Sequence, residues 1–202
     1  LYALTEYAVA SKKAEAAGVA AELFYLLEEK AHDATYGGYL EWFRRDWGPG
    51  PEVGTYMGTP PGGKLMNTHL HLLEPLTTYS DLSGDDLVRD RLIELIFVQS
   101  NAVLRKDVGA CTDKYARDWT PLLEPEYARV SYGHDIENVW LLLEACRAAG
   151  LPNGPLTDLY RQLADYALRY GFDRQRGGFY DAGNFSQPAD AKNKVWWVNC
   201  PN

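Results

Sequence analysis

The chain has 202 residues, 46% of them hydrophobic, and a net charge of −8. The hydrophobic fraction is enough for a substantial core, whereas the negative charge argues against nucleic acid, which needs clustered Lys and Arg. No apolar run approaches the roughly 18 residues of a membrane span, and no signal peptide is visible. The three cysteines, Cys111, Cys146 and Cys200, lack metal or redox spacing, so we expect reduced thiols in a cytoplasmic protein.

The first part of the chain alternates helical patterns with irregular ones. Apolar residues at helical spacing predict helices over 3–11 and 13–31. The glycine pair at 37–38 then predicts a tight turn, followed by a short strand within 33–42. Residues 48–64 hold six glycines and four prolines, so they form a loop that is long enough to be functional rather than a plain connector.

Four further helices are predicted in the rest of the chain. They are expected over 66–79, with Pro75 as a kink, over 84–104, from about 131 to Gly150, and over 156–170. A second glycine pair at 177–178 predicts another turn. The chain opens without methionine, already in a helical pattern, and stops soon after two tryptophans, which is typical of a fragment.

Several of these features repeat at intervals near 70 residues. Arg-Asp-Trp occurs at 45–47 and 117–119, and the two glycine pairs are two such intervals apart. Repeated helical hairpins that bury one face must stack, either in an open solenoid or in a closed ring whose inner helices begin at one mouth. We therefore expect one all-α domain over 1–202, with short β-hairpin excursions.

The first chemically notable cluster is residues 66–71 (Met-Asn-Thr-His-Leu-His). Asn67 and His71 are four apart and share a helix face, whereas His69 points away. Asn67 and His71 are thus candidate contacts of a polar ligand, and His69 a structural histidine. A metal site is not expected, because histidines two apart diverge in a helix and no further ligands accompany them.

The second cluster is residues 131–137 (Ser-Tyr-Gly-His-Asp-Ile-Glu). His134 and Glu137 are three apart on one face, so that the carboxylate can orient the imidazole and raise its basicity for acid/base work. Alternatively, His134 ties the helix start to the preceding loop and Glu137 forms a buried pair. Two clusters of matching build favour the catalytic interpretation. Glu74, one turn beyond the first cluster, is either a supporting group or a solvated one.

Trp196 and Trp197 are candidates for a stacking platform under a sugar ring. Neighbouring helical positions face about 100° apart, so at most one of them stacks on a ligand and the other belongs to the core.

Three motifs and two turns of the chain resemble, in the same order, those of the N-acylglucosamine 2-epimerase superfamily and most closely its cellobiose 2-epimerase branch. They are residues 66–74 (Met-Asn-Thr-His-Leu-His-Leu-Leu-Glu), 131–137 with Trp-Leu-Leu-Leu-Glu-Ala at 140–145, 194–198 (Lys-Val-Trp-Trp-Val), and the turns at 36–39 and 177–180. The resemblance implies an (α/α)6 barrel, here incomplete, which epimerises a reducing-end sugar such as that of cellobiose at C2, with no metal or other cofactor.

In the implied mechanism one histidine removes the proton alpha to the carbonyl and a second returns it to the other face. His134 would be one of that pair, with Glu137 beside it, Asn67 and His71 on the sugar oxygens, and a tryptophan of the pair 196–197 stacked on the ring. The resemblance places the partner histidine and an early arginine outside this sequence, which looks like the middle half of such an enzyme. We therefore expect the chain alone to be inactive.

Three alternatives remain at this point. An aldose–ketose isomerase of the mannose type would share the scaffold and the first proton abstraction. A non-catalytic helical module, which binds sugar or forms a homodimer over its exposed apolar flanks, is the second. A glycoside hydrolase is weaker, because only Glu137 and Asp135 offer carboxylates in the main motif.

Overall fold

A computed structural model describes residues 1–54 and 57–199. The helices in this part of the chain are α1 (Tyr2–Ser11), α2 (Ala14–Lys30), α3 (Met66–Ser83), α4 (Asp86–Phe97), the π-helical turn η1 (Val98–Ala102), α5 (Tyr132–Ala149), the 3-10 turn η2 (Gly154–Leu156), α6 (Thr157–Tyr170) and α7 (Trp196–Asn199). The strands are β1 (Lys64–Leu65), β2 (Leu104–Arg105), β3 (Ala110–Cys111), β4 (Lys114–Tyr115), β5 (Arg129–Ser131) and β6 (Ala182–Asn184).

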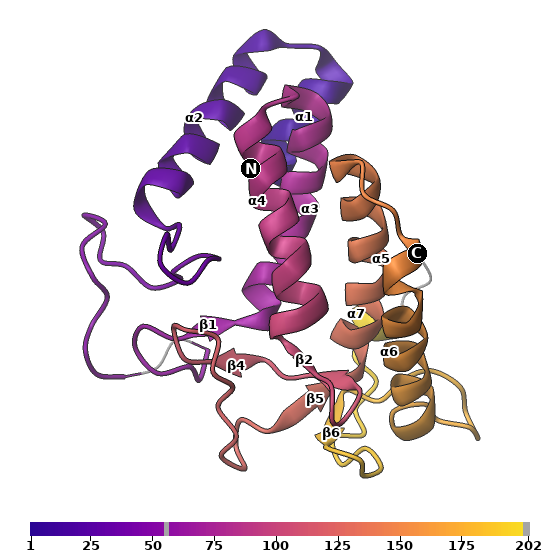
Figure 1. Ribbon diagram of the computed structural model, residues 1–202. Coiled ribbons are helices and arrows are strands. Elements are labelled where there is room, and N and C mark those ends of the chain that lie inside the picture. Colours follow the sequence, from indigo (N-terminus) through magenta and orange to yellow (C-terminus); the bar gives the residue numbers. More distant parts are fainter. Residues whose placement is uncertain (55–56, 200–202) are drawn as a thin grey trace.

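The helices form hairpins that stack side by side. The odd-numbered helices are neighbours in chain order: α1 packs on α3, α3 on α5 and α5 on α7. Each of α2, α4 and α6 packs on the odd-numbered helix that precedes it in the chain, and α4 also contacts α5. Figure 1 shows the strands and loops gathered at the end where α3 and α5 begin. Over the described residues the stack stays open and does not close into a ring. This agrees with the prediction of an incomplete barrel.

The main core lies between these hairpins and is closely packed. Leucines at helical spacing on α3, α4 and α5 are fully buried in it, namely Leu70, Leu73, Leu92, Leu95 and Leu142. Burial of each such side chain contributes roughly 1.5–3 kcal/mol, so this shared face fixes how the helices lie against one another. Within the described part of the chain, no helix is both long enough and apolar enough to cross a membrane.

The helices predicted near α1, α2, α5 and α6 are confirmed within a few residues, but two others differ. The third helix continues past 79 to Ser83, where Gly84 ends it in a left-handed conformation (φ 61°). The helix predicted over 84–104 is present over 86–102, but it changes at Phe97 from the α-helix α4 to the π-helical η1, which the sequence did not predict. Inside η1, buried Gln99 donates from Nε2 to the carbonyl of Met66 (2.9 Å). This long-range bond leaves no trace in the local sequence pattern.

The predicted excursions contain fewer β-strand residues than expected. The strand expected within 33–42 reduces to the single bridge between His32 and Tyr39. Instead, three two-stranded antiparallel ladders form, β1 with β4, β2 with β3 and β5 with β6. The strands β1 and β5 run directly into α3 and α5, and each pairs with a strand from elsewhere in the chain. These ladders therefore hold both helix starts at the same end of the stack. The long loop expected over 48–64 is present, apart from residues 55–56, which lie outside the described part.

A lysine fastens each glycine-pair turn to the start of the next odd-numbered helix. Lys64 donates from Nζ to Asp33 Oδ2 (2.9 Å) and to a carbonyl of the first glycine pair. Lys194 repeats the arrangement with Asp173 Oδ2 (2.8 Å) and the second glycine pair. All four glycines have φ between 71° and 79°, a conformation that favours glycine. The sequence repeat is thus a repeat of structure.

The fourth residue of each of the helices α3, α5 and α7 accepts a backbone N–H from the excursion that precedes it. The pairs are Tyr39 N to His69 Nε2 (2.8 Å), Cys111 N to Asp135 Oδ1 (3.0 Å) and Phe179 N to Asn199 Oδ1 (2.7 Å). Three different side chains supply the same acceptor at equivalent positions. The rotation of each helix about its axis is thereby fixed relative to its loop, which decides which side chains face the neighbouring helix start.

Candidate active site

The two clusters singled out in the sequence meet where α3 and α5 begin. Asn67 donates from Nδ2 to His134 Nε2 at 2.7 Å, across 67 positions of the chain. Asp113 holds the start of α3, since its carboxylate accepts from the amide of Asn67 (3.0 Å) and its carbonyl accepts from the amide of Met66 (2.8 Å). The lone pair of His134 Nε2 therefore points at α3, and the ring proton resides on Nδ1.

His71 and Glu137 complete a group around His134. The rings of His71 and His134 lie edge to face with centroids 6.2 Å apart. One nitrogen of each histidine and a carboxylate oxygen of Glu137 all lie within 4.8 Å of one another. Glu74, one turn further along α3, accepts from His71 Nδ1 at 3.3 Å and so orients its ring. The group holds two imidazoles and a carboxylate, which can exchange protons or ligate a cation.

Burial sets the protonation of this group. It lowers the pKa of His134, an effect that the carboxylate of Asp113 opposes, and the neighbouring His71 lowers this pKa further. Burial also raises the pKa of Glu137, while His71 lowers it. The Oε2 atom of Glu137 is buried and has no hydrogen-bond partner among the described residues. His134 is therefore neutral near pH 7 and able to accept a proton.

Of the tryptophan pair, only Trp197 belongs to this site. Its ring lies against that of His134, with centroids 4.7 Å apart and 34° between the planes. Trp196 is 76% exposed and lies outside the core as well, so the expectation that the second tryptophan is buried was wrong. Gly133 makes the approach possible, because a Cβ at this position would lie only 2.8 Å from the indole of Trp197. The glycine of the motif thus makes room for an aromatic ring.

His69 and Asp135 come from the same motifs but face away from the site. His69 is fully buried, donates from Nδ1 to the carbonyl of Leu65 (2.6 Å), and accepts the amide of Tyr39 at Nε2. Burial lowers its pKa to about 4, so it stays neutral. Burial raises the pKa of Asp135 to about 8. Both side chains are loop anchors, as expected for His69, and Asp135 offers no second carboxylate for glycoside hydrolysis.

Two clefts adjoin the site. One, of about 260 Å³, is lined by residues that include His134, Asp113, Asp181 and Trp197. The second, of about 100 Å³, is lined by residues that include Glu137 and Trp197. The first cleft carries carboxylates and an imidazole, which suits a ligand rich in hydroxyl groups. Its volume accommodates a single sugar ring.

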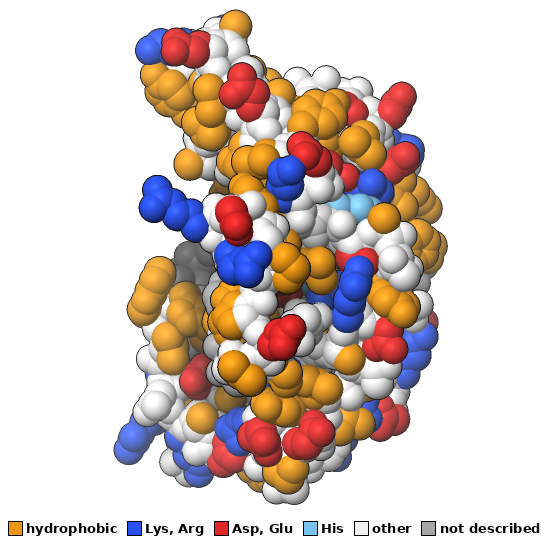
Figure 2. Space-filling view, turned by 90° about the vertical axis from the view of Figure 1, so that its left-hand side faces the viewer, with side chains coloured by type: hydrophobic (Ala, Val, Ile, Leu, Met, Phe, Trp, Pro, Cys, Tyr) orange, Lys and Arg blue, Asp and Glu red, His pale blue; other side chains and the backbone are white. Residues whose placement is uncertain are grey.

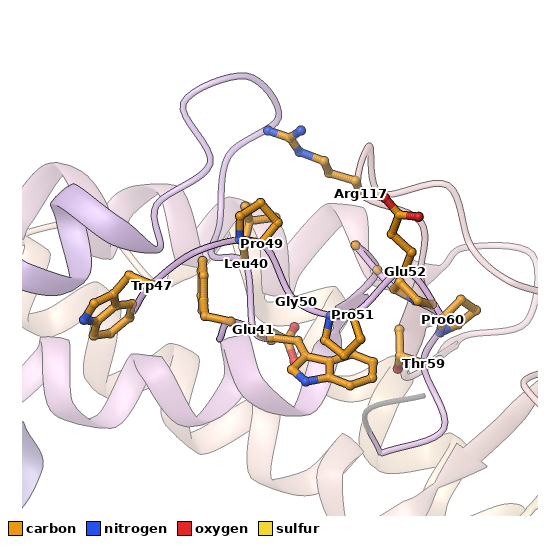
Figure 3. A pocket seen from close by; sticks show the side chains of 15 residues that line it. Leu40, Glu41, Trp47, Pro49, Gly50, Pro51, Glu52, Thr59, Pro60 and Arg117 are labelled. Carbon is orange, nitrogen blue, oxygen red and sulfur yellow. The ribbon is translucent and has the colours of Figure 1, made fainter. Parts of the chain in front are cut away.

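A larger cavity of about 430 Å³ lies in the loop of residues 40–63 and contains none of the predicted site residues. Figure 3 shows Trp47, Pro49 and Pro51 along this loop, with Arg117 reaching over from another segment. At its floor, Glu41 accepts from the amide of Leu65 at 2.5 Å, and burial raises the pKa of this carboxyl to about 7. The cavity is larger than either cleft near His134, but no histidine is among the described residues that line it.

The structure therefore brings together Asn67, His71, His134, Glu137 and Trp197, and leaves Trp196 apart.

Sequence reasoning missed two further residues that build the site, Asp113 and Gln99. Gln99 ties η1 to the start of α3, and its carbonyl accepts from Asn138 of α5 (3.1 Å), so that one residue joins both helices. Neither residue stands in a motif. Gln99 lies within the helix predicted over 84–104, and Asp113 lies in the irregular stretch that precedes the second cluster, so no local signal marked either as part of the site.

Several known proteins resemble this chain in sequence and in structure. The sequence profile of the N-acylglucosamine 2-epimerase (GlcNAc 2-epimerase) family matches residues 1–201. The cellobiose 2-epimerase of Bacteroides fragilis is 35% identical over 150 residues, which cover 74% of this chain and 37% of that protein. That of Ruminococcus albus is 30% identical over 98% of this chain and 49% of its own length. The chain thus spans about half the length, or less, of these curated relatives.

Solved structures show the same partial overlap. The cellobiose 2-epimerase of Bacillus thermoamylovorans superposes with a TM-score of 0.85 at 28% identity, over 98% of this chain and 49% of that one. The enzyme of Spirochaeta thermophila gives 0.79 at 31% identity, over 98% and 48%. A D-mannose isomerase gives 0.77 at 20% identity, over 97% and 48%, which shows a shared fold alone. The helical hairpins are thus part of an α/α barrel, and the chain belongs to the N-acylglucosamine 2-epimerase family.

Proposed function

We propose that this chain supplies half of the active site of a sugar 2-epimerase that acts on the reducing-end sugar of cellobiose or a related β-1,4-disaccharide. The observation that carries the proposal is the meeting of His134 with Asn67 and Trp197 at the helix starts. A neutral imidazole with an unprotonated Nε2 is suited to remove a weakly acidic C–H proton near pH 7. The relatives named above, which bear the name cellobiose 2-epimerase, support the choice of substrate.

The chemistry at His134 starts from the open-chain aldose. Nε2 takes the proton from C2, and the C–H electron pair forms the C1–C2 double bond of an enediolate while negative charge moves onto O1. The Nδ2 group of Asn67, which contacts Nε2 before the sugar binds, then donates to a sugar oxygen, while Nε2 of His71 accepts from a sugar hydroxyl. The preorganised donor on Asn67 stabilises the developing oxyanion. Glu137, on the same face of α5, stabilises the imidazolium that forms.

Inversion at C2 requires that a proton return on the face of the enediolate opposite to His134. The ring of Trp197 lies against one side of His134. A sugar that stacks on Trp197 turns one face toward α3 and α5 and its opposite face away from both helices. His71 lies beside His134 and not across from it. We propose that the second acid belongs to a part of the protein outside these 202 residues, and that the chain alone does not turn over.

The test is incubation with cellobiose in D2O, followed by NMR at C2. The protein encoded by the full coding sequence is expected to form the C2 epimer with deuterium incorporated, and His134→Gln in that protein should abolish both signals. The 202-residue chain alone should form no epimer. Steady epimer formation by the chain alone would refute the half-site, and undiminished turnover in His134→Gln would refute the role of that residue.

The same spectra distinguish an aldose–ketose isomerase from an epimerase, because the first proton abstraction is common to both. An isomerase returns the proton to C1 and accumulates a ketose, whereas the proposed enzyme returns it to C2. A ketose as the main product would replace the epimerase proposal with the isomerase.

We also propose that the protein forms homodimers and resides in the cytoplasm, without nucleic-acid or membrane partners. Figure 2 views the side on which α2 lies, where hydrophobic side chains are exposed among charged ones. Aromatic residues on α1 and α2 are about half exposed, namely Tyr2, Tyr7 and Tyr25. Light scattering over a dilution series tests the dimer, and a monomer at every concentration argues against it.

The proposed location in the cytoplasm is supported by the cysteines. Buried, unpaired Cys111 and Cys146 fit a reducing compartment; Cys200 lies outside the described residues.

A further inference from the structure

Three side chains that commonly ligate transition metals converge at the helix starts. Ligand atoms of His71, His134 and Glu137 all lie within 4.8 Å of one another. Neighbouring ligands of a tetrahedral zinc ion are about 3.3 Å apart, so these atoms need to approach by at most about 1.5 Å. His71 is exposed, and a small rotation of its side chain supplies much of this movement.

The surroundings of the three side chains also suit a cation. Glu74 accepts from His71 Nδ1, which leaves Nε2 of that ring unprotonated and repeats the carboxylate–histidine pairing common behind metal ligands. Glu137 Oε2 is buried and has no hydrogen-bond partner among the described residues, although a buried carboxylate oxygen normally has one. A cation held between Glu137 and the imidazoles would satisfy this oxygen.

We propose that His71, His134 and Glu137 bind a divalent transition-metal cation such as Zn²⁺. Two imidazole nitrogens and one carboxylate oxygen favour Zn²⁺, Cu²⁺, Ni²⁺ or Co²⁺ over Mg²⁺ and Ca²⁺, which prefer all-oxygen sites. Three protein ligands leave a fourth position open to water or to a sugar hydroxyl.

The bound cation acts as an inhibitor and not as a cofactor. It occupies the nitrogen lone pair of His134 that Asn67 contacts in its absence, and the same lone pair takes the C2 proton in the proposed reaction. The sugar and the cation therefore compete for binding at His134. This inhibition rests on the proposed epimerase function, whereas the binding of the cation does not.

The binding is tested without sugar and without turnover. Zn²⁺ is titrated into the protein by calorimetry, and Co²⁺ by its visible absorption, with His71→Gln and Glu137→Gln as site variants. His32→Gln is the matched control, because His32 pairs with Glu94 (3.1 Å) in another part of the fold. All proteins carry Cys200→Ser to remove a competing thiol, and circular dichroism verifies that each is folded. We expect one Zn²⁺ per chain, at least tenfold weaker binding in each site variant, unchanged binding in His32→Gln, and no response to Mg²⁺.

Equal Zn²⁺ affinity in the folded site variants and in His32→Gln would overturn the site, and so would Mg²⁺ binding of similar strength. Inhibition is measured separately on the protein from the full coding sequence, where Zn²⁺ should raise the apparent KM for cellobiose and leave kcat unchanged. Inhibition that cellobiose does not relieve would overturn the competition while the binding result stands. Absence of any epimerase activity would count against the proposed function and not against the cation site.

Discussion

Asn67 Nδ2 lies 2.7 Å from His134 Nε2, so that the starts of two helices which are 66 residues apart share one hydrogen bond. The amide holds the imidazole in one tautomer and one orientation. Each helix is in turn anchored by its fourth residue, His69 in α3 and Asp135 in α5. The geometry of the candidate site therefore also depends on bonds that its own side chains do not make.

Replacing Asn67 by Ala removes the hydrogen bond to His134 and a proposed donor to the sugar. We expect kcat/KM of the protein from the full coding sequence to fall about fivefold to tenfold, since a hydrogen bond of this kind is worth about 1–1.5 kcal/mol. Stability should change little, because the Asn67 side chain is partly exposed. Exposed Asn101→Ala is the control, and equal kcat/KM values in the two variants would contradict the role of Asn67.

Gly133→Ala tests the contact between α5 and Trp197. A Cβ at this position would lie 2.7 Å from Val198 Cγ2 and 2.8 Å from the indole, so Trp197 must move away from His134. Overpacking of this kind costs about 1–3 kcal/mol, and the loss of activity should exceed what the loss of stability explains. Gly18→Ala in α2 is the matched control, because nothing lies within 4 Å of its added Cβ. That variant should gain about 0.5–1 kcal/mol. Urea unfolding measures the free energy of unfolding of both variants, and equal changes in the two would contradict the steric explanation.

Gln99→Glu tests whether η1 ties the two helix starts together. At pH 7 a carboxylate would replace the Nε2 group that donates to the carbonyl of Met66, and both buried oxygens would lack a donor. We expect a loss of about 1–3 kcal/mol in the free energy of unfolding. The loss should shrink toward pH 5, where a protonated Glu can donate again. Gln162→Glu, at an exposed position, is the control; a loss independent of pH would argue against this hydrogen bond.

His69 predicts a pH dependence of stability. Burial lowers its pKa in the folded protein to about 4 from 6.5, so between these values the unfolded chain binds more protons. Its contribution is complete above pH 6.5 and is lost as the pH falls to about 4, by up to about 3 kcal/mol. Other groups also titrate between pH 4 and 7, for example Glu41, because burial raises the pKa of its carboxyl to about 7.

The measurement is therefore a difference between the wild type and His69→Asn, the residue type that α7 uses at the equivalent position. Urea unfolding at pH 7, 6, 5 and 4 should show the wild type losing stability relative to the variant as the pH falls, because other titrating groups are common to both proteins. A constant difference over this range would mean that His69 is not held neutral in the fold.

Local patterns in the sequence were enough to predict most of the helices and the chemical groups of the candidate site. Helical periodicity and glycine pairs depend on interactions within a few residues, so the helices and the left-handed turns at 37–38 and 177–178 could be read locally. The spacing of His134 and Glu137, and of Asn67 and His71, placed each pair on one face of a helix because 3.6 residues make a turn. The motifs also indicated the family, which the profile match confirms.

Which of these groups lie close together depends on long-range contacts in the fold. Whether Trp197 or Trp196 faces His134 depends on the rotation of α7, which Asn199 fixes through a loop 20 residues earlier. The end of α4 at Phe97 and the π-turn around Gln99 depend on bonds to α3 and α5, which outweigh the continuous helical pattern. Asp113 holds α3 from an irregular segment with no pattern of its own. Such contacts join residues tens of positions apart, and no local preference of the chain encodes them.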